Sequence, residues 1–277
     1  MQHNIIRLGN ITMIEKNGFL SSDIEAWKIK HRSDNKQLFQ LCEILNEFSH
    51  DTMLSLNVSN DDLTEILSAC SFVRAMSNFQ SIVILCELGL INEAKIILRC
   101  LVEAMFLMVA IAKDHDFSLK IVNQDLLEQQ RTSKVLKKNI LNGVHKLDKP
   151  TLEEVDKRIS ELKKQIKDNG VKLIYKSDIA RAAGLSSFYD TIYHILSGTV
   201  HINPSDLEQY LDLTPERNVK EIKWGPDVDE IEDVLFSAIE SMIFVLQSIA
   251  HVFKVEYGVK WDALHNEYKT LGGQVNG

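Results

Sequence analysis

Apolar residues recur at intervals of three and four along most of this chain, a pattern typical of amphipathic α-helices. It predicts helices over residues 22–48, 63–88, 93–112, 116–141, 152–168, 185–201 and 231–257, with a brief one after Ser205. Capping-box spacing at Ser22–Glu25 and Thr151–Glu154 marks two of the starts, and Asn-Gly pairs at 142–143 and 169–170 mark two of the ends.

The tight turn over residues 88–92 joins two of the longest predicted helices and makes them antiparallel neighbours. We therefore predict an all-α fold, a bundle of long antiparallel helices with a protruding charged helical hairpin. Residues 1–60 would form an N-terminal arm and helix, 61–257 the helical core domain with 131–181 as a basic hairpin insertion, and 258–277 a C-terminal tail. Residues 1–20 read as a short strand or an extended arm, 213–226 as a structured loop, and the end from Gly272 as disordered.

Composition agrees with a globular protein: 45% of the 277 residues are hydrophobic and 25% are charged. The four cysteines lie in apolar helical pattern without metal-type spacing, and no signal peptide is evident, so we expect reduced thiols in a cytoplasmic protein. The apolar run over residues 96–112 is interrupted by charge and is shorter than the roughly 20 residues of a membrane span, so no membrane partner is expected.

The net charge of −8 is unevenly distributed. Residues 131–181 hold fourteen Lys and Arg against seven Asp and Glu, a local charge of +7, which leaves −15 on the rest. This segment could hold RNA or an acidic protein partner, or it could be a solvated hairpin of mixed charge.

The strongest candidate for chemistry is an ion pair in an apolar helix. Arg99 and Glu103 lie one turn apart within residues 96–112, so we expect both to be buried together. Burying charges costs several kcal/mol per ion (roughly, after relaxation) unless they are paired. A functional site or a need for fold specificity would explain that cost.

A second polar stripe lies on another predicted helix. Tyr193, Ser197 and His201 are four residues apart and share one face. If that face packs on Arg99 and Glu103, Glu103 would hold Arg99 and His201 could act as a general acid or base. The alternative is that the three residues only satisfy the ion pair and fix helix register.

Other motifs add little. Arg74 and Asn78 form a further polar pair that either joins this network or faces solvent. Ser197 lacks the setting of a nucleophile elbow, and the chain has neither a phosphate-binding loop with a following Lys nor a zinc-binding His-Glu-x-x-His motif. We therefore expect no cofactor and no metal.

Two motifs together carry a resemblance: Leu98-Arg99-x-x-x-Glu103 after an apolar helix and a Gly-Leu turn, and Tyr193-x-x-x-Ser197-x-x-x-His201 with Pro204. Over roughly residues 63–253 the chain resembles a bacterial family catalogued as domain of unknown function 5677, which is distantly similar to HEPN-type helical domains. Many HEPN proteins are ribonucleases or toxins of phage defence that work as dimers. The resemblance implies a site made of Arg99, Glu103, Tyr193, Ser197 and His201.

One feature departs from the HEPN ribonucleases, in which an arginine precedes a histidine by four to six intervening residues on one helix. No arginine of this chain has that spacing. A metal-independent ribonuclease would need Arg99 to act from a different helix than His201.

Two functional hypotheses follow. In the first, the protein is a homodimeric antiviral-defence or toxin effector that acts on RNA, with His201 as acid or base and Arg99 stabilising charge on phosphate. In the second, it is a non-catalytic binding or regulatory module, in which the cluster is structural or holds a small anionic ligand.

Overall fold

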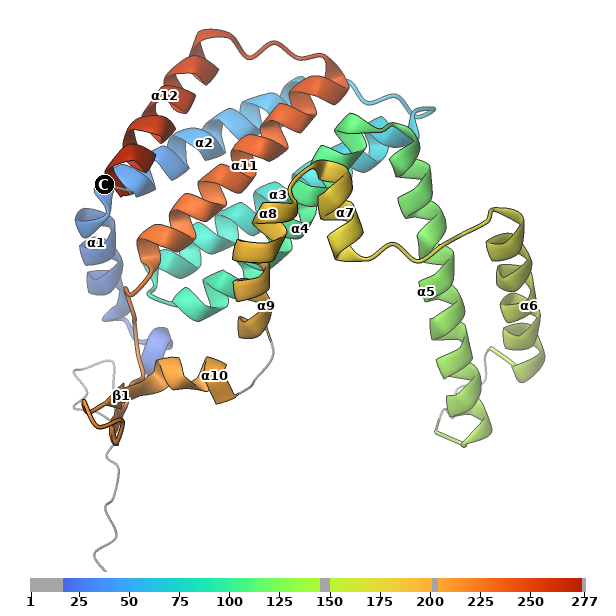
Figure 1. Ribbon diagram of the computed structural model, residues 1–277, viewed down its shortest axis with the longest axis horizontal. Helices are drawn as coiled ribbons and strands as arrows, with labels where there is room; N and C mark the ends of the chain where they lie inside the picture. Colours follow the sequence, from blue (N-terminus) through green and yellow to red (C-terminus); the bar gives the residue numbers. More distant parts are fainter. Residues whose placement is uncertain (1–16, 145–149, 201–203, 276–277) are drawn as a thin grey trace, which may run out of the picture.

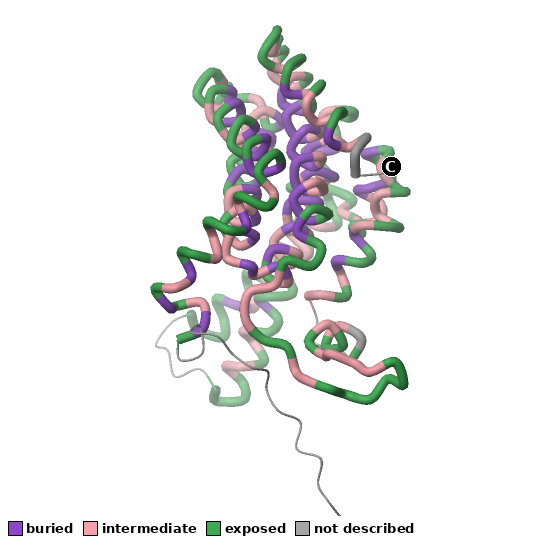
Figure 2. The backbone as a smooth tube through the Cα atoms, turned by 90° about the vertical axis from the view of Figure 1, so that its left-hand side faces the viewer, coloured by how far each residue is buried: buried purple, intermediate pink, exposed green. Residues whose placement is uncertain are grey.

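Three long helices form the centre of the fold in the computed structural model, which describes residues 17–144, 150–200 and 204–275 (Figure 1). They are α3 (Leu63–Glu87), α4 (Ile91–Lys113) and α11 (Ile231–Phe253), and each packs against the other two. Their facing sides are apolar and form one continuous core, visible as the purple centre of Figure 2. The all-α class predicted from the sequence is confirmed.

Helix starts follow local chemistry where a polar side chain can reach free backbone N–H groups. The carboxylate of Asp62 accepts from the N–H groups of Thr64 and Glu65 at the start of α3. Thr151 and Glu154 form the predicted capping box of α6 (Leu152–Asp168).

Helices α5 (Asp116–Leu141) and α6 form the projecting hairpin in Figure 1. They pack against one another, with Val155 and Leu162 of α6 buried, while only the start of α5 approaches α3 and α4. Lys137 and Asp156 join the two helices by an ion pair of 2.6 Å.

Helix α7 (Lys176–Ala183) returns the chain to the core and packs on α4. It is followed by α8 (Ser186–Phe188), a π-helical turn over Tyr189–Tyr193 and α9 (His194–Thr199), which also packs on α4. Helix α10 (Pro204–Leu207) and a 3-10 turn (Glu208–Tyr210) lead into the strands. The predicted helix over 185–201 thus exists up to Thr199 but contains a π turn.

Three predictions at the two ends of the chain need correction. The predicted helix over 22–48 is two helices, α1 (Ile24–Asp34) and α2 (Lys36–Ser55), because the chain bends at Asn35. The predicted helix over 231–257 ends at Phe253, and Lys254 takes a left-handed conformation. The predicted tail over 258–277 instead forms α12 (Gly258–Val275), which packs on α2.

The predicted loop over 213–226 contains part of a two-stranded antiparallel sheet of β1 (Leu211–Leu213) and β2 (Val219–Ile222). Leu211 pairs with Ile222, and a bulge lies between Asp212 and Leu213. This hairpin lies beside a short 3-10 turn at Gly18–Leu20 and the α3–α4 turn, below the bundle in Figure 1.

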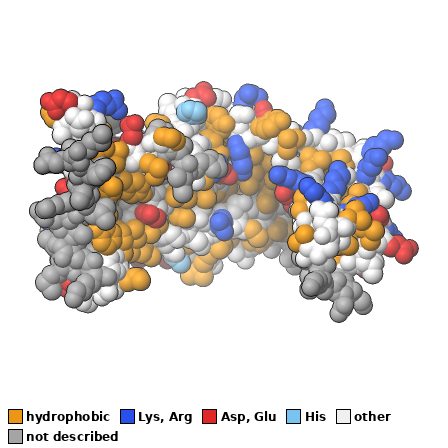
Figure 3. All heavy atoms as spheres, turned by 90° about the horizontal axis from the view of Figure 1, so that it is seen from below, with side chains coloured by type: hydrophobic (Ala, Val, Ile, Leu, Met, Phe, Trp, Pro, Cys, Tyr) orange, Lys and Arg blue, Asp and Glu red, His pale blue; other side chains and the backbone are white. Residues whose placement is uncertain are grey.

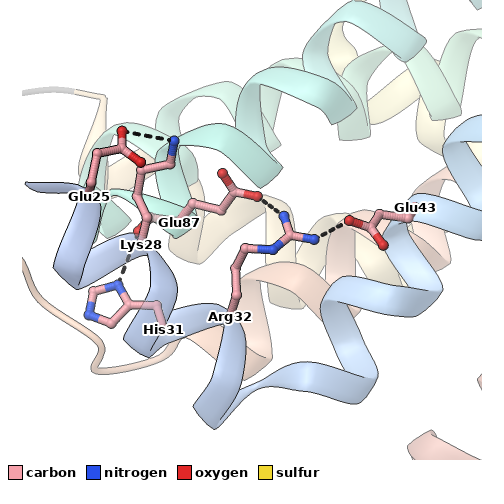
Figure 4. Close-up of polar contacts among 6 residues, drawn as sticks. All are labelled: Glu25, Lys28, His31, Arg32, Glu43 and Glu87. Atoms are coloured by element: carbon pink, nitrogen blue, oxygen red, sulfur yellow. Dashed lines mark hydrogen bonds and ion pairs between the residues drawn. The ribbon is translucent and has the colours of Figure 1, made fainter.

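Helix α1 is attached to the bundle by charged contacts at its C-terminal end (Figure 4). The guanidinium of Arg32 donates to Glu87 of α3 and to Glu43 of α2. The imidazole of His31 is fully buried, with Nδ1 3.2 Å from the carbonyl oxygen of Glu87. Burial lowers the pKa of His31, so this side chain is neutral in the folded protein at neutral pH.

Two described helices, α3 and α11, are long and apolar enough to cross a membrane by length and composition alone. Both belong to the central layer, and α11 is the more buried of the two. Core helices of soluble proteins pass the same test, so this is weak support for a membrane location.

Candidate functional site

Arg99 and Glu103 of α4 meet the polar face of the segment around α9. Nη2 of Arg99 donates to the Tyr193 hydroxyl at 2.7 Å and lies 3.2 Å from Oε1 of Glu103. Nε of Arg99 donates to Oγ of Ser197 at 3.3 Å. The structure thus brings four of the predicted site residues into one cluster.

The hydroxyl protons of this cluster are already committed. Tyr193 donates its proton to Glu103 at 2.9 Å while accepting from Arg99. Ser197 donates to the backbone carbonyl oxygen of Tyr193 at 2.8 Å, so its oxygen faces Arg99 only as an acceptor. Neither hydroxyl is arranged as an activated nucleophile. Ser197 donates to a carbonyl oxygen, which is not a general base, and the Tyr193 hydroxyl is already bonded to both charged groups of the ion pair.

The electrostatics of Tyr193 agree with this. Burial, followed by the hydrogen bond to the Glu103 carboxylate, raises the pKa of Tyr193 to about 12, with Arg99 opposing the shift. The phenol is therefore protonated at neutral pH and acts as a hydrogen-bond bridge between the two charges. The Arg99 guanidinium also lies over the Tyr193 ring, 4.9 Å from its centroid.

Lys176, the first residue of α7, is a cluster member that sequence reasoning missed. Its ammonium pairs with Oε2 of Glu103 at 2.7 Å. Two residues earlier, Ile174 is held at both backbone groups by the side-chain amide of Gln124 on α5. The loop that delivers Lys176 is thereby fixed to the root of the hairpin, a long-range contact with no signal in local sequence.

Aromatic packing holds Tyr193 in position from its own segment and from α4. The rings of Tyr189 and Tyr193 stack with centroids 4.9 Å apart, and both lie about 6 Å from Phe106. The π turn over Tyr189–Tyr193 carries these two aromatics. Such turns are rare and are often found at functional sites.

The charged pair is less buried than the sequence predicts. The side chains of Arg99 and Glu103 are 25% and 21% exposed. Two short helices, α7 and α9, pack on this side of α4, and the pair stays partly exposed beneath them. The cluster is therefore open to solvent on one side.

Three other predicted site residues, His201, Arg74 and Asn78, are not among the described members of the cluster. His201 lies outside the described residues, so its prediction stays untested. Arg74 is exposed on α3, and Asn78 is buried with its Nδ2 atom lacking a partner in the described part of the chain. Neither makes a hydrogen bond or ion pair with Arg99 or Glu103 among the described residues.

Positively charged side chains also lie outside the cluster, on the α5–α6 hairpin. Figure 3 shows Lys and Arg side chains gathered on the α5–α6 projection. On α5, Arg131, Lys134 and Lys138 line a shallow groove of about 340 Å³ with apolar residues between them. Within the described ranges, no group of three His, Cys, Asp or Glu residues could hold a metal ion.

Comparisons with known proteins place the chain in a family without a known activity. The family of unknown function DUF5677 matches residues 65–219, which is more than half of the 277 residues. The match spans α4, the hairpin and α9, and so includes every described member of the cluster. No curated protein and no solved structure matches the chain. The chain therefore belongs to the DUF5677 family of unknown function.

Proposed function

We propose that the cluster of Arg99, Glu103, Tyr193, Ser197 and Lys176 is a phosphate-binding site through which this protein acts on RNA. The observation that carries the proposal is an excess of positive charge at a half-open site. Two cations face one carboxylate, and Nη1 of Arg99 makes no hydrogen bond or ion pair with any described residue. Without a partner among the described residues, its two N–H groups can donate to a phosphate oxygen.

The basic hairpin supports a polyanionic ligand over a small one. The α5–α6 projection begins beside the loop that carries Lys176 and extends away from the core (Figure 1). A strand whose phosphate sits at Arg99 could continue along these lysines, each contact adding sequence-independent affinity.

In this proposal His201 supplies the proton transfers and Arg99 stabilises the charge that develops on phosphate. The described cluster offers no substitute for His201, because Tyr193 remains protonated and Ser197 donates to the backbone carbonyl of Tyr193. The resulting protein is a HEPN-like effector of the defence or toxin type, a metal-independent ribonuclease located in the cytoplasm.

The test separates RNA binding from folding by using an exposed member of the cluster. Lys176 is 52% exposed, so Lys176→Met should leave the melting temperature nearly unchanged. Lys36→Met is the matched control, since Lys36 is exposed on α2 and has no ion pair among the described residues. Binding of a labelled single-stranded oligoribonucleotide is measured by fluorescence anisotropy at several salt concentrations.

We expect Lys176→Met to weaken RNA binding and to reduce the salt dependence by about one counterion, with Lys36→Met unchanged. Cleavage of the same RNA on gels, and growth arrest on expression, should be lost in His201→Ala. Intact RNA and normal growth at high protein levels would reject the ribonuclease, and equal binding by both lysine variants would reject the site.

A second candidate is a non-catalytic module in which the cluster only locks α9 and α7 onto α4. The observation in its favour is that both hydroxyls and both carboxylate oxygens are already satisfied within the cluster. It predicts that Arg99→Ala lowers stability without changing RNA binding. The proposed RNA site predicts that both change.

We also propose that the protein is a homodimer, a property that the HEPN resemblance implies. Twelve of the 23 residues of α11 are buried in the core, so that helix offers little apolar surface to a second copy. Exposed apolar side chains near the start of α5, such as Leu119 and Val122, are better placed to meet a second copy. Light scattering of the purified chain tests this, and a monomer at micromolar concentration would contradict it.

A further inference from the structure

A cavity of about 580 Å³ lies at the end of the bundle where the β-hairpin meets the core. Its walls come from four separate parts of the chain: the turn and helix at 19–27, the α3–α4 turn at 89–93, residues 209–212 and residues 221–227. This volume lies within the range of small-ligand sites. The RNA proposal does not use it.

The walls of this cavity are unusually aromatic for this chain. Phe19, Trp27, Tyr210 and Trp224 line it, so it holds two of only three tryptophans in the protein. Trp224 is 47% exposed although it is a large apolar side chain. An indole face left open to a cavity is an incomplete contact that a ligand can complete.

The polar lining is strongly negative. Among the described lining residues, four carboxylates, from Glu93, Asp212, Glu221 and Asp227, share the cavity wall with one cation, Lys223. Asp212 is neutralised by Lys220 at 2.8 Å. The side-chain carboxylates of Glu93 and Glu221 make no hydrogen bond or ion pair with any residue the structure describes, and Glu221 only interacts at longer range with the charge of Lys220. Both can therefore meet a ligand directly.

The walls are held in place by close backbone packing. A Cβ at Gly89 would lie 2.8 Å from Cβ of Pro226, and the Gly89 carbonyl oxygen accepts from the N–H of Asp227 at 2.9 Å. The Trp224 ring packs on Gly18, where an added Cβ would lie 3.1 Å away. Tyr210 is tied to α4 because its hydroxyl accepts from Asn92 at 3.1 Å. The cavity is therefore formed before any ligand arrives, which lowers the entropic cost of binding.

We propose that this cavity binds an organic cation, an alkylammonium or guanidinium group placed against the indole faces and neutralised by Glu93 and Glu221. Aromatic faces attract cations through the ring quadrupole, and a weakly hydrated organic cation gains most from leaving water there. A phosphate or carboxylate ligand is disfavoured by the four carboxylates. A bare metal ion is disfavoured because no described trio of ligands lies close enough to coordinate it.

The ligand chemistry has two sources, a free polyamine or a lysine or arginine side chain of a peptide. Two probes distinguish them: spermidine, and an acetylated, amidated tripeptide with arginine at its centre. Binding is followed by tryptophan fluorescence in a Trp261→Phe background, so that the signal comes from Trp27 and Trp224 alone. Trp261 can be replaced for this purpose because it lies on α12, contacts Phe48 and Tyr257 and is not part of the cavity lining.

Two matched pairs of variants test the site. Glu221→Gln removes one charge without changing shape, and its control is Glu256→Gln, an exposed carboxylate in the loop after α11. Trp224→Leu keeps apolar bulk but removes the aromatic face, and its fold is checked by its melting temperature. The controls matter because a chain of net charge −8 attracts any cation weakly.

We expect saturable binding of at least one probe, weakened about fivefold by Glu221→Gln and unchanged by Glu256→Gln, with the affinity falling as salt rises. Trp224→Leu should weaken binding about three- to thirtyfold. The probe that binds more tightly identifies the source of the ligand. No saturable fluorescence change with either probe at millimolar concentration, or equal losses in the two glutamate variants, would overturn the proposal.

Discussion

Replacing Arg99 by alanine should destabilise the protein to an extent that its contacts define. The substitution removes the hydrogen bonds to Tyr193 at 2.7 Å and Ser197 at 3.3 Å, the ion pair with Glu103 and the cation–π contact with the Tyr193 ring. It also exposes the apolar surface that the arginine stem covers.

The expected loss of stability can be estimated contact by contact. The charge-assisted bond to Tyr193 contributes about 1.5 kcal/mol, the low end for a bond to a charged group because Arg99 is partly exposed, and the longer bond to Ser197 contributes less. The ion pair contributes at most about 1 kcal/mol, because both side chains are partly in water. The cation–π contact adds about 0.5–1 kcal/mol.

Removing one partner of a fully buried pair costs about 3–5 kcal/mol, because the other charge is left alone. Glu103 is not left alone here, since Tyr193 and Lys176 still contact it and water reaches it. We therefore expect a loss of about 2–3 kcal/mol, equivalent to a fall in melting temperature of about 4–10 °C for a chain of this size.

Thermal and urea unfolding followed by circular dichroism measure this loss. Arg74→Ala is the control, because Arg74 is an exposed arginine on the neighbouring helix α3 without a contact to the cluster among the described residues. That variant should stay within about 0.5 kcal/mol of the parent protein. If Arg99→Ala were no less stable than Arg74→Ala, the cluster would not hold α9 on α4 and the argument from its contacts would fail.

Three further predictions concern other parts of the fold. Gly89→Ala should cost more than about 2 kcal/mol in urea unfolding, because its φ is +72° and a Cβ would lie 2.8 Å from Pro226. Gly143→Ala, at φ +68° with no described atom within 4 Å, should cost only about 1 kcal/mol, and equal losses would contradict the close packing at Gly89. The pKa of buried His31 is lowered from 6.5, so the unfolded chain takes up the proton at a higher pH than the folded protein, and stability should fall as the pH drops below about 6.5. His31→Leu should reduce this pH dependence in unfolding measured at pH 7.5 and 5.5. An unchanged pH dependence would refute the role of His31. Burial raises the pKa of the Cys86 thiol and shields it from reagents. An aromatic disulfide reagent should therefore modify exposed Cys70 in the native protein and Cys86 only after denaturation. Rapid modification of Cys86 in the native protein would contradict its burial.

The long helices could be predicted from sequence because their signals are local. Helix α5 has the predicted limits of Asp116 and Leu141, and the capping box at Thr151 forms as its spacing indicates. The α3–α4 turn follows from Gly89, whose φ of +72° suits glycine. In each case neighbours in sequence supply the decisive contacts.

The errors fall where distant contacts decide the structure. The β1–β2 hairpin has strands of only three and four residues, too short for an alternating pattern to stand out. Helix α12 has a weak apolar pattern of its own, and it is fixed by burying Leu264 and Leu271 next to α2. The bend at Asn35 lets Arg32 reach Glu87 and Glu43, a tertiary requirement that helical propensity does not contain.

The same distinction between local and distant contacts applies to the candidate site. Spacing of four on each helix placed Arg99 and Glu103 on one face, and Tyr193 and Ser197 on another, so their meeting could be anticipated once two faces had to pack. Lys176 could not be anticipated, because it reaches Glu103 only through the loop that Gln124 fixes. Exposure could not be anticipated either, since it depends on how α7 and α9 pack on α4.

The hydrogen-bond donors and acceptors of the cluster favour binding of an anion over catalysis by the described residues. All the acceptors that it contains are occupied, whereas Arg99 keeps two N–H groups and Lys176 keeps further donors without a partner among the described residues. An anion would therefore add contacts without breaking those that stabilise the fold. The described part of the cluster lacks a free general base, because the hydroxyls of Tyr193 and Ser197 donate hydrogen bonds to internal partners and the Glu103 carboxylate is held by Arg99 and Lys176. Binding can thus belong to the packed helices, while any catalysis must come from a residue beyond them, and on this stripe the next such residue is His201.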